Sequence, residues 1–272
     1  MNLITQFKKS LGFYCAANQF VELSKRYFES QASDQLTNSE AFHALADSYK
    51  ITLTSYEPTD TARTISLSYI VNIHLCFESF LTELGDHAKK YGVNAVSKPE
   101  KGETPLSYAE RTVLVSSSKE ITSRIKLCDY YREVRNTAVH DPKNEGRRVN
   151  AAFNKLKKYS YKTDAKYAKL EAPNPFDSIT FDDFVMFART CNELANCFYN
   201  DLQYSYEKII DSMEMARIVK LCCYNNQQRG MNALAKYIES EFKCDPSLGA
   251  NIEELYDRVL VRSSNRLRHP PL

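Results

Sequence analysis

Residues 70–84 read IVNIHLCFESFLTEL, and this stretch decides the fold. Alternating spacings of four and three residues separate Ile70, His74, Phe77, Leu81 and Leu84. That period puts all five side chains on one stripe of a helix, as in the seam between the packed helices of a bundle. The stretch therefore predicts a long core helix that runs from about residue 61 to residue 91.

Helical patterns continue on both sides of this seam, and few residues interrupt them. The 272 residues include 7 glycines and 9 prolines, too few for the many tight turns of a chain of short strands. Thr180 and Asp183 form a helix-start signal, a cap followed by an acid three residues later. A second seam follows it, at Phe184, Phe187, Cys191, Leu194, Phe198 and Leu202. Further helices are expected at 3–30, 38–55, 105–115, 119–139, 206–224, 229–242 and 251–267.

The pattern predicts an all-α protein built around a four-helix bundle. We expect this bundle over residues 59–205, because two long seamed helices flank the amphipathic helix at 119–139. Residues 1–58 are then an N-terminal helical extension, and residues 206–272 form a C-terminal helical region. No internal repeat is visible.

Several classes of protein are disfavoured by what the chain lacks. It has no run of eighteen apolar residues and no apolar block after its first methionine, so we expect a soluble, cytoplasmic protein that does not enter a membrane. The 8 cysteines are scattered without paired C-x-x-C motifs, which predicts reduced core cysteines and no metal. Nucleotide-binding, hydrolase and zincin motifs are absent too, and no cofactor is expected.

Charge is concentrated in one segment. The whole chain carries a formal charge of +2, whereas residues 143–170 hold nine bases against two acids, a net of +7. This segment predicts an RNA-binding face, on which Tyr159, Tyr161 and Tyr167 stack on bases. A solvated lysine-rich helix face is the alternative. The bases expected to contact the RNA backbone are Arg147, Arg148, Lys155, Lys157, Lys158 and Lys162.

The chemistry is predicted to lie just before this segment, in the sequence YYREVRNTAVHD at residues 130–141. Arg135 and Asn136 are followed by His140, and Pro142 implies that the helix ends by about His140. An imidazole can give or take a proton near neutral pH, and a guanidinium can hold a phosphate. On an ideal helix residues 135 and 140 are about 140° apart, so the helix end must free the histidine to reach the arginine.

A helical bundle that carries Arg135, Asn136 and His140 in this order resembles the HEPN superfamily. The signature of that family is an arginine, often followed by a polar residue, with a histidine after four to six intervening residues. The resemblance covers about residues 59–205. It implies a HEPN-like four-helix bundle and a metal-independent endoribonuclease, as in toxin–antitoxin pairs, phage-defence systems and CRISPR effectors.

The resemblance and the chemistry together predict a mechanism. The ribose 2′-hydroxyl attacks the adjacent phosphate to give a 2′,3′-cyclic phosphate, with His140 transferring protons, Arg135 stabilising charge and Asn136 in support. One histidine can hardly be base and acid at once, so we expect a homodimer whose two motifs form a composite site. The expected partners are RNA, for example tRNA, and an antitoxin or another defence-system protein.

Other residues stay open to two interpretations. His74 and Glu78 lie one turn apart on the long helix and are predicted to support the site, although a buried, paired histidine is the simpler interpretation. Arg258, Arg262 and Arg266 line one helix face that contacts RNA, a partner or only water. A non-catalytic helical module that binds RNA or protein is the alternative function, with Arg135 paired to Glu78 or Asp129.

Overall fold

The computed structural model describes residues 2–31, 39–53, 58–92, 98–113, 118–140, 146–161, 164–224, 226–242 and 251–268. Within these ranges the chain is mostly helical, and its strand-like pairing is an isolated bridge between Gly92 and Tyr204. The predicted all-α class is confirmed. The helices are α1 (Leu3–Gln31), α3 (Ser39–Ser48), α4 (Pro58–Tyr91), α5 (Pro105–Val113), α6 (Lys119–His140), α7 (Arg147–Leu156), the 3₁₀ helix η2 (Phe176–Ser178), α8 (Phe181–Asp201), α9 (Tyr206–Ser212), α10 (Met215–Cys222), α11 (Gln227–Phe242) and α12 (Ile252–Arg268).

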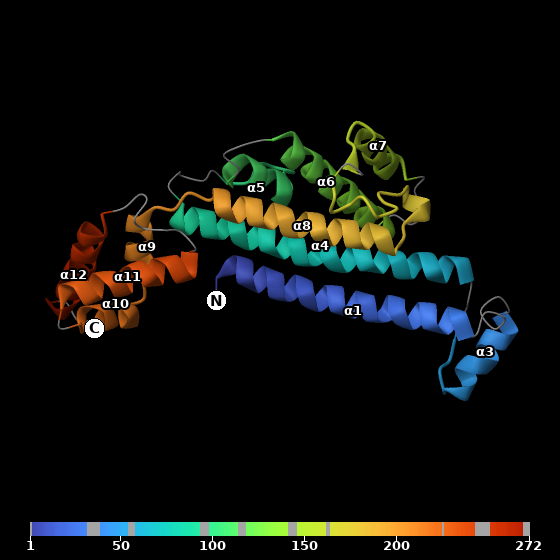
Figure 1. The fold of residues 1–272 in the computed structure, drawn as a ribbon, viewed down its shortest axis with the longest axis horizontal. Helices are drawn as coiled ribbons and strands as arrows, with labels where there is room; N and C mark the ends of the chain where they lie inside the picture. Colours follow the sequence, from blue (N-terminus) through green and yellow to red (C-terminus); the bar gives the residue numbers. More distant parts are fainter. Residues whose placement is uncertain are drawn as a thin grey trace. The chain divides into compact units, whose positions relative to one another are not determined.

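Two compact units divide the chain. We call residues 7–80 and 116–197 the bundle unit, and residues 1–6, 81–115 and 198–272 the terminal unit. This division differs from the predicted boundaries at 58 and 205, because most of α1 belongs with the motif helix α6. In the bundle unit α4 and α8 lie side by side, with α1 along one side of them and α6 along the other (Figure 1).

The predicted seams form the core of the bundle unit. Ile70, His74 and Phe77 are buried on α4, and the first half of the second seam is buried on α8. The Tyr69 ring of α4 contacts the Phe184 ring of α8, with 5.7 Å between the centroids. Apolar side chains at helical spacing therefore fixed which faces of these helices pack together.

A buried carboxylate begins α8, as the sequence predicted. Asp183 accepts hydrogen bonds from the backbone N–H of Thr180 at 2.9 Å and from that of Asn174 at 2.8 Å. It also accepts one from the hydroxyl of Tyr131 on α6, at 2.9 Å. Asp183 therefore satisfies the backbone donor of Thr180 at the start of α8 and that of Asn174 in the preceding loop, and it fastens α6 to this end of the helix.

The C-terminal helices of the terminal unit make a separate core. Helices α9 to α12 share one cluster of buried side chains, centred on Ile210, Ile218, Leu234, Ile238 and Val259. The helix predicted over 206–224 is two helices, because the chain turns at residues 213–214 between α9 and α10.

One helical span, Asp60–Tyr91, is long and apolar enough to cross a membrane by length and composition alone. Half of its most apolar window is buried inside the protein, a property that core helices of soluble proteins share.

Candidate functional site

The three residues of the predicted motif come together at the end of α6. The Nη1 group of Arg135 lies 3.0 Å from Oδ1 of Asn136, to which it donates a hydrogen bond. The same Nη1 lies 3.2 Å from Nε2 of His140. The helix ends at His140, as predicted, and the long arginine side chain spans the angle between the two positions. We call these three residues the motif cluster.

The contact between Arg135 and His140 assigns a role to one ring nitrogen. A guanidinium has donors and no acceptor, so Nε2 of His140 accepts in this hydrogen bond. The imidazole of His140 is exposed to solvent.

No carboxylate among the described residues forms an ion pair with Arg135. The guanidinium contacts the amide and the imidazole of the motif cluster. Of the two rival partners, Asp129 pairs with Lys126 and Arg132, and Glu78 lies 3.6 Å from Nδ1 of His74. A guanidinium without a carboxylate partner is free to bind an oxyanion.

His74 on α4 is the second imidazole associated with this cluster. It is 7% exposed, and its Nδ1 has no hydrogen-bond partner among the described residues. Burial, followed by the nearby charges of Arg135 and Arg132, lowers the pKa of His74 to about 4. The ring is therefore neutral at pH 7, and its carboxylate neighbour Glu78 is 42% exposed at the side chain.

The other end of α6 carries a different arginine site. Arg124 is 7% exposed and pairs with Glu120 at 2.5 Å, Asp164 at 3.3 Å and Glu193 at 2.7 Å. Burial lowers the pKa of Arg124, but Glu193 and its other partners raise it by more. Because three carboxylates compensate its charge, this guanidinium is a poor site for an anionic ligand.

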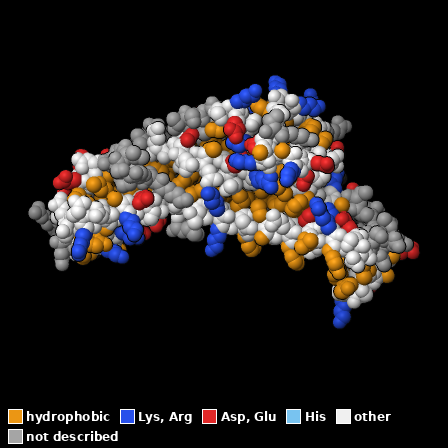
Figure 2. Space-filling view, viewed as in Figure 1, with side chains coloured by type: hydrophobic (Ala, Val, Ile, Leu, Met, Phe, Trp, Pro, Cys, Tyr) orange, Lys and Arg blue, Asp and Glu red, His pale blue; other side chains and the backbone are white. Residues whose placement is uncertain are grey.

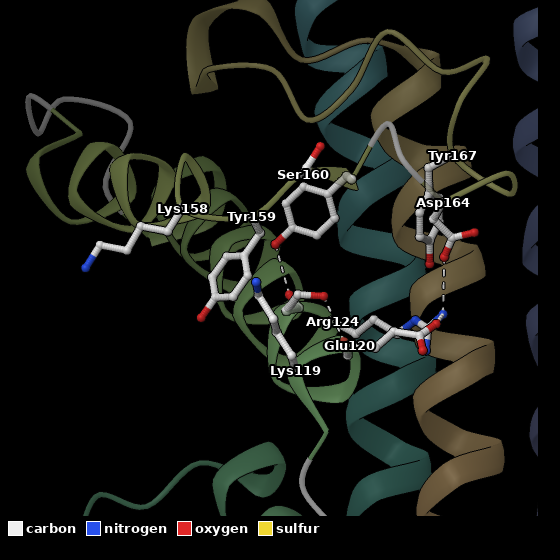
Figure 3. Close-up of a pocket in the computed structure, with 10 residues that line it drawn as sticks. Lys119, Glu120, Arg124, Lys158, Tyr159, Ser160, Asp164 and Tyr167 are labelled. Carbon is white, nitrogen blue, oxygen red and sulfur yellow. Dashed lines mark hydrogen bonds and ion pairs between the residues drawn. The ribbon is translucent and has the colours of Figure 1, made fainter.

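A cavity of about 530 Å³ opens beside Arg124 (Figure 3). Lys119, Tyr159 and Asp164 contribute to its lining, while Lys158 extends away from Arg124 at its edge. Eleven residues separate Arg124 from Arg135, which is about 16 Å along the helix. The cavity is therefore remote from the motif cluster.

Helix α7 runs back along α6, and this direction orders the basic residues. The Tyr130 ring contacts the Phe153 ring at 5.4 Å, and the Tyr161 hydroxyl donates to the Ser123 carbonyl at 2.9 Å. Later residues of the segment thus meet earlier residues of α6, so the two run antiparallel.

The predicted RNA-binding residues consequently fall into two groups. Arg147 and Arg148, both exposed, begin α7 at the level of the motif cluster. Lys155, Lys157 and Lys158, also exposed, lie further toward the Arg124 end of α6. Lys162 lies outside the described residues.

Two of the three tyrosines predicted to stack on bases are core residues, and that prediction is wrong for them. Tyr161 is 7% exposed and Tyr167 is 2% exposed. Burial raises the pKa of both hydroxyls, and the Tyr167 hydroxyl bonds to Glu193 at 2.9 Å. Tyrosine at this spacing therefore fixes the segment against the bundle, and half-buried Tyr159 alone has a partly free ring.

The arginine stripe of α12 is largely structural. Arg258 forms a two-point pair with Asp211 at 3.1 and 2.7 Å. Arg262 donates to the carbonyls of Ile210 and Met213, which closes the end of α9. The Arg266 side chain lies outside the described residues.

Comparisons of the chain with protein-family models, with curated proteins and with solved structures found no match. Function must therefore be inferred from the site itself. Among the described residues, no three side chains of His, Cys, Asp or Glu are grouped as a metal site requires.

Proposed function

We propose that the protein is an endoribonuclease of the HEPN type that cleaves RNA without a metal ion. The carrying observation is the motif cluster, in which a guanidinium that pairs with none of the described carboxylates lies 3.2 Å from an exposed imidazole. Metal-independent RNA cleavage needs these two groups: one to hold the phosphate and one to move a proton. We also propose that the helical bundle has the HEPN-like four-helix form.

The reaction forms one bond and breaks another at the phosphorus. A base removes the proton of the ribose 2′-hydroxyl, the 2′-oxygen bonds to phosphorus, and the bond to the 5′-oxygen breaks. An acid then gives a proton to that leaving oxygen. Arg135 stabilises the charge that grows on the non-bridging oxygens, and Asn136 holds the guanidinium in place. DNA lacks the nucleophile and should resist.

Two proton transfers need two groups, since one imidazole cannot serve both in a single step. Within one chain His74 is the other imidazole near Arg135, but its burial and its pKa of about 4 make it a weak proton donor at pH 7. A composite site in a homodimer, with the partner supplying its own motif, is the arrangement predicted from the sequence. The two arrangements give different results when an inactive variant is mixed with the wild type.

The substrate path follows α7. Arg147 and Arg148 are placed to hold the backbone next to the motif cluster, and Lys155, Lys157 and Lys158 continue the positive charge along the helix. Phosphate contacts of this kind position RNA without reading its sequence. A role as a toxin or a defence effector, on tRNA or another structured RNA, stays a prediction.

The test is incubation of the purified protein with RNA in excess EDTA, followed by mapping of the new ends. We expect a 2′,3′-cyclic phosphate and a 5′-hydroxyl, and we expect His140→Ala to lose at least about 100-fold in rate while its helical CD spectrum is unchanged. His87, a half-buried histidine of the terminal unit, is the control, so His87→Asn should keep cleaving. Equal cleavage by His140→Ala would leave the non-catalytic binding module as the better account.

A mixing experiment identifies the second proton-transfer group. Adding excess His140→Ala protein to wild type lowers the activity per wild-type chain if each site needs a histidine from both chains, because every mixed dimer then lacks one of the two. With His74 as the second group the wild-type chains keep their full activity in the mixture, and His74→Gln alters the pH profile of cleavage. A loss of activity in the mixture would support the composite site.

A further inference from the structure

Helix α1 carries an apolar stripe on its outer side. Phe13, Phe20, Leu23 and Tyr27 are 71%, 71%, 67% and 68% exposed, although they belong to residue types that usually pack in cores. Together with exposed Ala16 they follow spacings of three, four, three and four residues. This is the period of a seam between two helices. Hydrophobic side chains are visible along the lower edge of the bundle unit, over α1 (Figure 2).

A buried polar network holds this stripe outward. On the opposite side of α1, Asn18 accepts a hydrogen bond from Asn72 at 3.0 Å, and Glu22 accepts one from the Tyr69 hydroxyl at 3.3 Å. Asn18 and Glu22 are 3% and 5% exposed. Turning α1 to bury its aromatic side chains would strand these polar groups, which costs more than a hydrogen bond returns. Helix α1 thus buries polar side chains on one side and exposes aromatic side chains to solvent on the other.

The stripe also has the composition of a contact surface. No charged residue occurs from Ser10 to Val21, a run of twelve. Gly12 lies within the helix, where glycine costs about 1 kcal/mol relative to alanine. A side chain at this position would meet nothing within 4 Å, so packing inside the chain does not require glycine here. A partner that approaches α1 closely would require a residue without a side chain at this position.

We propose that a second copy of this chain docks on the stripe, with the two α1 helices antiparallel about a two-fold axis at Phe20. The area is sufficient. The four large side chains offer on the order of 500 Å² per copy, so a symmetric pair that buries them fully removes on the order of 1,000 Å² from water, which reaches the lower threshold for a specific interface. This dimer differs from the composite homodimer predicted from the sequence, in which the two motifs meet.

The antiparallel direction follows from the order of large and small residues. About an axis at Phe20, Leu23 of one copy lies over Ala17 of the other, and the Tyr27 ring reaches the end that holds Gly12. A parallel pair would set small residues against small ones and leave voids, which cost stability. It would also bring Lys8 and Lys9 of the two copies together, whereas the antiparallel pair separates them.

This dimer keeps the two catalytic clusters apart. In the bundle unit α4 and α8 lie between α1 and α6 (Figure 1). A contact through the outer side of α1 therefore leaves each motif cluster facing its own solvent, and each chain must supply both proton-transfer groups. The dimer is measured without RNA. A failure of the dimer proposal therefore leaves the proposed ribonuclease untouched, and a failure of the ribonuclease proposal leaves the dimer untouched.

The first experiment is analytical ultracentrifugation of the full chain over a range of micromolar concentrations. We expect a dimer for the wild type, and for Phe20→Glu a dissociation constant raised at least about 30-fold with an unchanged CD spectrum. Val219→Glu, on a half-exposed residue of α10, is the matched control and should stay dimeric. A monomeric wild type overturns the proposal, including one that binds lipid vesicles through this stripe; so does a dimeric Phe20→Glu.

The second experiment tests the direction with cysteines in a background of Cys223→Ser and Cys244→Ser, which removes the thiol that is exposed among the described residues and the one that lies outside them. Phe20→Cys and Phe13→Cys each delete one aromatic ring of the stripe, so they control for each other. About the proposed axis two copies of residue 20 meet, whereas residue 13 meets residue 27. Mild oxidation should cross-link Phe20→Cys and leave Phe13→Cys monomeric on a denaturing gel. Equal cross-linking at both positions contradicts the antiparallel pair.

Discussion

The two ends of α6 treat an arginine in opposite ways. Arg124 is buried and is compensated by three carboxylates. Arg135 lies eleven residues, or about three helical turns, further along, and its contacts are an amide and an imidazole. Both side chains have the same charge and lie on the same helix. An arginine without a carboxylate partner is therefore the better candidate for an anion site, because a paired carboxylate neutralises the charge of the guanidinium.

The largest effect should come from removing the compensated arginine. In Arg124→Ala the acids Asp164 and Glu193 lose their counter-charge in a poorly solvated place. We expect a loss of about 2–4 kcal/mol in the free energy of unfolding, below the full value for a fully buried pair because both acids are partly exposed. Urea denaturation measures it.

The control for this loss is Arg63→Ala, because the pair between Arg63 and Asp177 is exposed. It should change the free energy of unfolding by less than about 1 kcal/mol. Arg135→Ala should likewise be close to wild type. A destabilisation by Arg135→Ala as large as that by Arg124→Ala would remove the contrast between the two ends of α6.

The next effect is a loss of stability at low pH that depends on His74, whose pKa is lowered in part by the charge of Arg135. Its folded pKa of about 4 lies below the ordinary 6.5, so the unfolded chain binds this proton more readily. The contribution of this group to the free energy of unfolding is fully present above pH 6.5. It is lost between pH 6.5 and 4, by up to about 3 kcal/mol. Thermal unfolding across this range should show a shallower fall for His74→Gln.

His87 in the terminal unit gives a matched comparison. Burial, followed by the charge of Lys90, also lowers its pKa to about 4. His87→Asn should therefore remove a similar share of the acid sensitivity. If His74→Gln leaves the pH dependence of unfolding unchanged, His74 is not held neutral next to the arginines of α6.

The smallest effect separates RNA binding from chemistry. Replacing Lys155, Lys157, Lys158 and Lys162 by glutamine should flatten the dependence of log affinity on log salt by up to about 3 units, since each contact on single-stranded RNA contributes about 0.7. Fluorescence anisotropy in the His140→Ala background prevents cleavage during the measurement. An unchanged slope would mean that these lysines are only solvated, which would leave Arg147 and Arg148 as the basic residues at the site.

Periodicity and local signals predicted much of this molecule. The seams on α4 and α8, the cap formed by Thr180 and Asp183, and the end of α6 at His140 all follow from residues close in sequence. These features need only helical spacing and backbone chemistry. The contact between Arg135 and His140 depends on the same helix end.

Long-range packing decided the features that the sequence did not reveal. The carboxylates around Arg124 come from residues 120, 164 and 193, and no local pattern joins them. The antiparallel return of α7 placed Arg147 and Arg148, rather than the lysines, at the motif cluster. Tyr161 and Tyr167 have amphipathic rings that suit a base or a core equally well, so only the fold could show that they are buried.

The most direct test of the account is the single-turnover rate of RNA cleavage by Arg135→Ala, measured in EDTA alongside its free energy of unfolding. The account predicts a fully folded protein that has lost at least about 100-fold in rate, because the transition state has lost the charge that stabilised it. Arg135→Lys should recover part of the rate, since it restores charge without the two-point geometry. Wild-type cleavage by Arg135→Ala would contradict the account, since the uncompensated guanidinium would then have no part in the chemistry.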